Sequence, residues 1–309
     1  MQHSITGSVK KSRKWKFLTL DLMALPAAIY IFINNYIPMG GLFIAFKKIN
    51  YSKGIFGSDW IGFKNFQYLF KTKDAYVITR NTILYNLAFI VLGITLGIIV
   101  GILLSELWSK RSRKIYQTSI LLPQLISIII VAYIVFAFLS NETGFINVAI
   151  FGKDNSINFY GTPQYWPYIL TSVFLWKGLG YNSIIFLSSI VGIDRSLYEA
   201  AYVDGAGRIK QIFKITLPLI KPTIVMLVLI NVGRIFYSDF GLFYQVPRNS
   251  GLLYSVTNTI DTYVYRALLQ QNNIAMASAA GAYQAVVGFI IILLANAFVR
   301  RFDPENALF

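Results

Sequence analysis

The sequence contains no cysteine and a single histidine, His3, which lies in a polar N-terminal segment. Without cysteine the chain can form neither a disulfide framework nor a thiolate metal site, and its composition indicates no redox compartment. One histidine in a polar tail leaves few residues from which to build a nucleophile and base pair or a metal cluster. We therefore expect no catalytic residue, no metal ligand and no enzyme activity in this chain.

Charged residues are also scarce, at 13% of the 309 residues, against 56% hydrophobic and 16% aromatic residues. That much apolar surface exceeds what one soluble core needs, so the composition predicts an all-α integral membrane protein. The formal net charge of +15 would suit nucleic acid, but the basic residues stand in short segments between apolar runs. This distribution is typical of a topology signal, and we expect no nucleic acid partner.

Six apolar runs are long enough to cross a bilayer as helices. The first is too long for the core of a signal peptide and lacks a small-residue cleavage site, so we expect it to be retained. A polar tail at 1–16 precedes it, and a single transmembrane domain is predicted over 17–309. The predicted spans are about 17–46, 81–107, 115–139, 166–193, 219–237 and 274–299, and the third is expected to be continuous.

The distribution of basic residues orients these spans. Those of the tail, of a short basic loop at 110–114, of the stretch 196–218 and of the C-terminus fall on one side if the N-terminus is cytoplasmic. The loop at 47–80, expected outside with a short interfacial helix, is also basic, but long loops constrain orientation less. The prediction is six spans with both termini in the cytoplasm.

Small residues recur every four positions in the second predicted span, at Gly93, Gly97 and Gly101. Such spacing forms a groove that lets a partner helix approach closely. Close helix packing is the favoured interpretation, and helix sliding during transport is the alternative.

The stretch from Ser196 to Pro218 is too polar to cross a bilayer. Its apolar spacing predicts two short helices, with Gly205 and Gly207 at the join. Ser196 and Glu199 have the spacing of a capping box, which predicts a helix that begins near Leu197. The stretch is therefore expected to form a two-helix elbow held between spans.

The same stretch carries a family resemblance. Glu199-Ala200-Ala201, Gly205 and Ile215-x-Leu217-Pro218 resemble the EAA loop of bacterial ABC importer permeases. Over nearly the whole chain the sequence is similar to the complex-carbohydrate permeases of the LplB type. This similarity includes Tyr36-Ile37-Pro38-Met39-Gly40-Gly41 and the run from Gly54 to Phe66. One departure is Arg195, where many relatives carry proline ahead of the loop.

The resemblance implies the type I permease fold of ABC importers in a bacterial cytoplasmic membrane, as a multi-pass subunit. It implies that this chain is half of a pathway for oligosaccharides, beside a second, homologous permease in a heterodimer. A sugar-binding lipoprotein or soluble protein would deliver the substrate from outside. No cofactor is expected here, because an ABC ATPase dimer would bind ATP and Mg. The ATPase-coupling residues would be Glu199, Ala200, Ala201, Asp204 and Gly205, although Glu199 could serve helix capping alone.

Polar side chains within the spans are candidates for the substrate pathway, because such groups are costly in a bilayer unless they face a bundle interior or a wet cavity. Each of them alone is more often an interhelical contact than a substrate ligand, whereas the group, spread over three spans, favours substrate binding. Lys177 and Arg234 have no obvious acidic partner in the spans, which suggests an acidic glycan as a weaker hypothesis. The candidates are Trp176, Lys177, Tyr181, Asn182, Asn231, Arg234, Tyr283 and Gln284.

Two alternatives stay open from the sequence. An ion-coupled secondary transporter would also carry polar groups within its spans, but it usually needs an inverted repeat and a coupling carboxylate, and neither is evident. A permease for a solute other than a sugar is the second alternative.

Overall fold

A computed structural model describes residues 21–152, 155–302 and 304–306. The predicted tail at 1–16, with His3, and the start of the first predicted span lie outside the described residues. The described residues are mostly helical, with one two-stranded antiparallel hairpin among them.

The described residues contain four unbroken stretches and two bent pairs of helices that are long and apolar enough to cross a membrane. Counting each bent pair as one span gives the six spans that the sequence predicts. The unbroken stretches are Asp21–Phe46, α5 (Lys73–Ser105), Pro163–Val191 and Ile274–Arg301, which contain α8 (Trp166–Val191) and most of α16 (Ile274–Phe302). The bent pairs are α6 (Lys110–Leu125) with α7 (Ile128–Leu139), and Arg208–Leu219 with α12 (Lys221–Val232).

The third span is not continuous, which corrects the prediction for 115–139. α6 and α7 meet at an angle of 93°. Pro123 in the last turn of α6 has no N–H to donate, and Ile126 and Ser127 adopt extended backbone with ψ of 130° and 140°. The residues predicted as a short basic loop at 110–114 instead form the first turns of α6.

Two other boundaries differ from the predicted ones. α5 begins at Lys73 rather than near 81, and α12 ends at Val232 rather than near 237. Both differences have one cause, because hydropathy marks the apolar part of a span whereas a helix extends or stops according to its hydrogen bonds.

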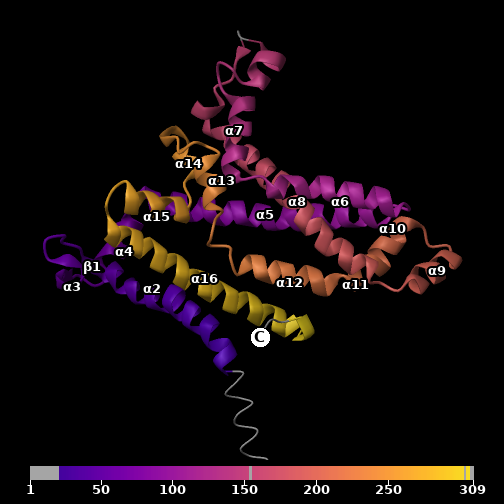
Figure 1. Cartoon of the computed structure of the whole chain (residues 1–309), viewed down its shortest axis with the longest axis horizontal. Coiled ribbons are helices and arrows are strands. Elements are labelled where there is room, and N and C mark those ends of the chain that lie inside the picture. Colours follow the sequence, from indigo (N-terminus) through magenta and orange to yellow (C-terminus); the bar gives the residue numbers. More distant parts are fainter. Residues whose placement is uncertain (1–20, 153–154, 303, 307–309) are drawn as a thin grey trace, which may run out of the picture.

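α5 runs along much of the length of the molecule, α8 packs beside it, and α6 packs on α8 (Figure 1). The predicted close packing of the glycine groove is confirmed, because Gly93, Gly97 and Gly101 are buried against α8. A Cβ added at Gly97 would lie 3.0 Å from Asn182 Cβ, and one added at Gly101 would lie 3.0 Å from Phe186 Cβ. α5 and α8 therefore form a closely packed pair.

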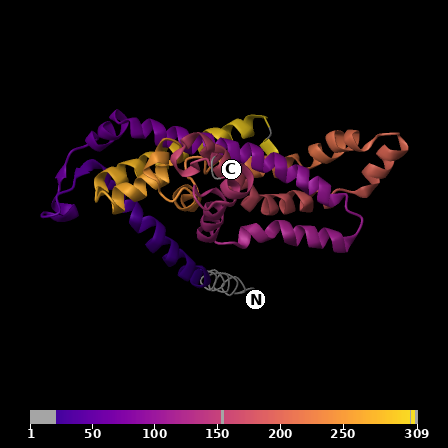
Figure 2. The ribbon, with the colours of Figure 1, turned by 90° about the horizontal axis from the view of Figure 1, so that it is seen from above.

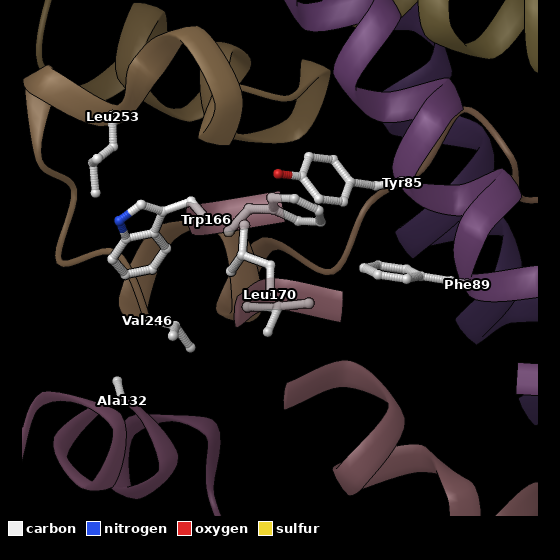
Figure 3. Close-up of a cluster of buried hydrophobic side chains, with 9 residues drawn as sticks. Tyr85, Phe89, Ala132, Trp166, Leu170, Val246 and Leu253 are labelled. Carbon is white, nitrogen blue, oxygen red and sulfur yellow. The ribbon is translucent and has the colours of Figure 1, made fainter. Parts of the chain in front are cut away.

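A buried aromatic cluster joins this pair to α7 and to the segment before α16 (Figure 3). Trp166 lies at its centre, fully buried, and its Nε1 donates a hydrogen bond to the Phe159 carbonyl at 2.8 Å. The described members are Tyr85, Phe89, Ala132, Trp166, Leu170, Leu242, Phe243, Val246 and Leu253.

β1 (Lys47–Lys48), α3 (Gly54–Gly57), α4 (Lys64–Lys71) and α15 (Ile260–Leu269) lie at the end of the molecule opposite α9 (Figure 1). Strands β1 and β2 (Asp59–Trp60) pair antiparallel, and α4 is the short helix predicted within 47–80. The other short helices are α2 (Ile37–Gly40), α13 (Phe240–Gln245) and α14 (Tyr254–Thr257). Single turns of other helix types are η1 (Phe32–Tyr36), η2 (Gly41–Phe46), η3 (Ile146–Phe151), η5 (Phe159–Gly161), η6 (Pro163–Tyr165), η8 (Gly251–Leu253) and η9 (Pro304–Asn306).

Candidate functional site

The predicted elbow consists of two helical arms that project at one end of the molecule (Figure 1). The first arm is α9 (Arg195–Val203), which follows directly after α8. The second arm is Arg208–Leu219, which leads into α12. It is built of α10 (Arg208–Gln211), η7 (Ile212–Thr216) and α11 (Leu217–Leu219). Residues 195–219 are called the elbow below.

Asp194 caps the first arm, which corrects the predicted capping box of Ser196 and Glu199. Its Oδ1 accepts a hydrogen bond from the Ser196 amide at 2.9 Å, and α9 begins at Arg195. Ser196 lies inside the first turn and cannot be the N-cap. Hydrogen bonds from the Ser196 backbone and side chain hold the pKa of Asp194 below its ordinary value. The cap is therefore charged at neutral pH.

Gly205 makes the turn between the arms. Its φ is +75°, in the left-handed region that glycine adopts without strain. The Ala206 amide donates to the Ala201 carbonyl at 2.8 Å, and the Gly205 amide donates to the Tyr202 carbonyl at 3.0 Å. These two bonds form a Schellman motif, which ends α9 and turns the chain.

Side chains then fix the angle of the elbow and tie it to the spans. The Tyr198 hydroxyl and Thr216 Oγ1, one on each arm, lie 2.8 Å apart. Arg208 forms an ion pair of 2.9 Å with Glu106 at the end of α5. A cavity of about 510 Å³ lies between the elbow and the ends of α5 and α8.

The outer surface of the elbow is apolar and exposed. Of the predicted coupling residues, Glu199, Ala200, Asp204 and Gly205 are exposed, and Ala201 is half-buried. Large apolar side chains surround them, with Tyr202 78% and Val203 84% exposed, and Ile209 and Phe213 on the second arm. Large apolar side chains gathered on a projecting element indicate a surface for another protein. The helical spacing of Ile209 and Phe213 was visible in the sequence, but it did not show that these side chains face outward.

Of the eight candidates for the substrate pathway, four are exposed and four make contacts inside the bundle. Trp176 and Tyr181 on α8, Asn231 on α12 and Arg234 just after it are exposed. Asn231 donates to the Leu227 carbonyl of its own helix.

The other four candidates make contacts inside the bundle. The Lys177 ammonium donates to carbonyls at the corner between α6 and α7. Gln284 is buried and donates to the Phe236 carbonyl at 2.7 Å, and Tyr283 packs edge-on against Phe70 and Phe236. Asn182 packs at Gly93. No hydrogen bond joins any two of the eight in the described part of the chain.

Helices long and apolar enough to cross a membrane, with a two-helix elbow projecting at one end, are the architecture of a membrane transport permease. The chain belongs to the family described as binding-protein-dependent transport system inner membrane component, whose profile matches residues 93–304. This membership agrees with the resemblance at the EAA loop.

Individual relatives match over most of the chain. It is 34% identical to the polygalacturonan/rhamnogalacturonan transport system permease protein YteP of Bacillus subtilis (strain 168), over 93% of this chain and 89% of YteP. It is 32% identical to the protein LplB of the same organism, over 96% of this chain and 92% of LplB. A crystal structure of a bacterial alginate ABC transporter in complex with an alginate pentasaccharide-bound periplasmic protein contains a chain with 36% identity. That match has a TM-score of 0.83 and covers 94% of this chain and 98% of the other.

Proposed function

We propose that this chain is one of two permease subunits of an ATP-driven importer of acidic oligosaccharides, and that it couples to a separate ATPase through the elbow. The observation that carries the proposal is the elbow itself. Its conformation is fixed by Asp194, Gly205 and the contact of Tyr198 with Thr216, while its apolar outer surface has no cover within the described chain. A shaped and uncovered surface at the end of two spans suits a docking partner that moves them.

The relatives and the exposed candidates support the substrate class. Alginate is an acidic polysaccharide, and polygalacturonan is likewise a polymer of a uronic acid. Trp176 and Tyr181 offer aromatic faces to sugar rings, and Asn231 and Arg234 offer donors to hydroxyl and carboxylate groups. Because Lys177 already donates to main-chain carbonyls, Arg234 is the better candidate for a carboxylate of the substrate.

The family and an exposed first span support the proposed protein partners of this chain. Residues 21–40 are exposed along their whole length and stand away from the bundle (Figures 1 and 2). A second, homologous permease beside them would complete the pathway, and a binding protein would deliver the oligosaccharide at the outer face. An ATPase dimer would close on ATP, carry both elbows with it and tilt α8 and α12. With the elbow in the cytoplasm of a bacterial cell, both termini lie in the cytoplasm too.

ATP-dependent uptake into proteoliposomes tests this proposal. The complete importer, with both permeases, the ATPase and the binding protein, is supplied with a labelled oligogalacturonide outside and ATP inside. Glu199→Lys is expected to lower uptake about tenfold or more, because a charge reversed in a docking contact is costly, and to weaken association with the ATPase. Glu142→Lys reverses a charge that is also exposed but lies away from the elbow, and it serves as the matched control.

Three outcomes would contradict the proposal. Uptake and ATPase association that survive Glu199→Lys would remove the coupling role of the elbow. Uptake driven by an ion gradient without ATP would favour a secondary transporter. A complex that hydrolyses ATP but imports only non-sugar solutes would overturn the substrate class.

A further inference from the structure

Lys177 lies in the middle of α8 and binds the backbone of another span. Its Nζ donates hydrogen bonds to the carbonyls of Ile126 at 2.6 Å, Gln124 at 3.1 Å and Pro123 at 3.4 Å. These carbonyls belong to the last turn of α6 and to the corner where the chain bends by 93° into α7. An ammonium group has three donors, so one side chain serves the whole corner.

The corner needs such a donor. The last carbonyls of a helix have no partner within it, and unpaired backbone groups are costly in a bilayer, where no water is available. A positive charge is also favourable at a helix C-terminus, where the carbonyl dipoles point. Charged residues within spans commonly pair with backbone carbonyls in this way. The polar break in the third span is thus stabilised by a residue of the fourth.

Gly180 brings the two helices close enough for this contact. It lies on the same face of α8 as Lys177, because residues three apart are neighbours on a helix. A Cβ added at Gly180 would lie 2.3 Å from the Ile120 carbonyl oxygen and 2.7 Å from its carbon. The backbones of α6 and α8 therefore touch one turn away from the Lys177 contact.

α8 connects this corner directly to the elbow. From Lys177 to Val191 the helix is unbroken, a length of about 21 Å at the usual rise per residue, and α9 begins at Arg195. Beyond the corner, Ile128 of α7 packs at Gly241, and Ala132 belongs to the buried cluster around Trp166 (Figure 3). A displacement at the elbow has a continuous path through α8 to α7.

We infer that Lys177 is a positioning residue that makes α7 follow α8 when the elbow moves, and that it does not contact the substrate. The inference rests on the proposed function, since it requires an elbow that the ATPase drives. Without the three hydrogen bonds, the corner can separate from α8, and motion of the elbow no longer reaches α7.

Distance measurements between spin labels test this inference in the complete importer. The chain has no cysteine, so cysteines introduced into it are its only labelling sites. One pair joins Arg195 on the elbow, outside its apolar outer surface, to Leu87 on α5, and the other joins Tyr133 on α7 to Leu87; all three residues are exposed. In the wild type both distances are expected to change when ATP is added.

Lys177→Met keeps the length of the side chain but removes its donors. In this variant we expect the distance from the elbow to α5 to respond to ATP as in the wild type, and the distance from α7 to α5 to lose its response. Uptake is expected to fall about tenfold at an unchanged KM for the oligosaccharide. Lys177→Arg retains charge and donors and is expected to restore most of the α7 response. If Lys177→Met does not assemble, Lys177→Gln keeps two N–H donors and is expected to give a reduced α7 response.

Each contrary result has a distinct meaning. The role of Lys177 is overturned if the distance from α7 to α5 still responds to ATP in Lys177→Met. It is also overturned if that distance does not respond in the wild type while the distance from the elbow to α5 does. If Lys177→Met raises the KM for acidic oligosaccharides and leaves the KM for neutral ones unchanged, Lys177 contacts the substrate and the positioning role is overturned. An elbow that does not respond to ATP in the wild type contradicts the proposed function instead.

Discussion

At the scale of single residues, polar side chains in the spans mainly serve the backbone. Asn86 of α5 donates to the carbonyls of Ile235 at 2.9 Å and Tyr237 at 3.0 Å, where the chain turns after α12. Gln284 of α16 donates to Phe236 in the same turn. Lys177 does the same at the corner between α6 and α7. The breaks after α6 and after α12 are therefore stabilised by donors from neighbouring helices, as a bilayer without water requires.

The two glycines beside Lys177 provide a matched pair of substitutions. Gly180→Ala forces a Cβ against backbone atoms of Ile120, which cannot move aside as a flexible side chain can. We expect a destabilisation of about 1–3 kcal/mol, the usual cost of overpacking. A Cβ added at Gly178 would meet no described atom within 4 Å, apart from the neighbouring turns of α8 itself. Gly178→Ala should therefore be neutral or stabilising by up to about 1 kcal/mol, through helix propensity.

Thermal unfolding of the detergent-solubilised permease complex measures both variants of this pair. Equal melting temperatures for Gly180→Ala and Gly178→Ala would show that α6 and α8 do not approach as closely as described.

At the scale of elements, local contacts fix the shape of the elbow. Its first helix, α9, is capped by Asp194, the chain turns at Gly205, and Tyr198 holds one arm to the other at Thr216. The ion pair of Arg208 with Glu106 adds an exposed contact to α5, and such pairs contribute about 0–1 kcal/mol. The turn at Gly205 is therefore expected to matter more for the shape of the elbow than the ion pair.

Substitution of Gly205 tests the importance of the turn. An alanine at φ +75° costs about 1–2 kcal/mol, because its Cβ crowds the following carbonyl in the left-handed region. We expect Gly205→Ala to weaken ATPase association several-fold and Gly205→Asn to weaken it less, since asparagine tolerates this conformation better. Gly207 has a φ of −65° and no described atom within 4 Å of an added Cβ, so Gly207→Ala is the control.

Association is measured as the amount of ATPase that co-purifies with the permeases across a range of salt concentrations. Identical losses from Gly205→Ala and Gly207→Ala would mean that the docking surface tolerates any side chain poorly, and that the turn is not the determinant.

At the scale of the whole molecule, the two ends have different character. The elbow projects at one end, and the hairpin, α4 and α15 lie at the other (Figure 1). α5 spans most of the distance between them, since its 33 residues correspond to roughly 50 Å. The first span leaves this bundle and contacts it through η2, which packs on α16. An apolar helix with so little intramolecular packing is available to a second subunit or to lipid.

We expect the first span to contact the second permease. Cysteine introduced at Ile29 or Phe32, both about half exposed, should form chemical crosslinks to that subunit in native membranes, because an apolar helix gains van der Waals contacts by packing on another protein. The crosslinked product should disappear when the second permease is not expressed. A first span that reacts only with lipid-soluble reagents and never with the other subunit would refute this arrangement.

The sequence by itself determined the membrane class, the apolar stretches long enough to span a membrane and the two-helix elbow, because hydropathy, helical spacing and the glycines at 205 and 207 are local properties of the chain. It also indicated the close packing of Gly93, Gly97 and Gly101, because glycines every four positions lie on one helix face. Only the tertiary structure decided that the third span bends at Ile126, that Asp194 rather than Ser196 caps α9, and that Lys177 binds carbonyls of another helix. The physical reason is that an unpaired carbonyl can accept from any donor that the fold brings within reach, and the distance along the sequence does not show which donor that is.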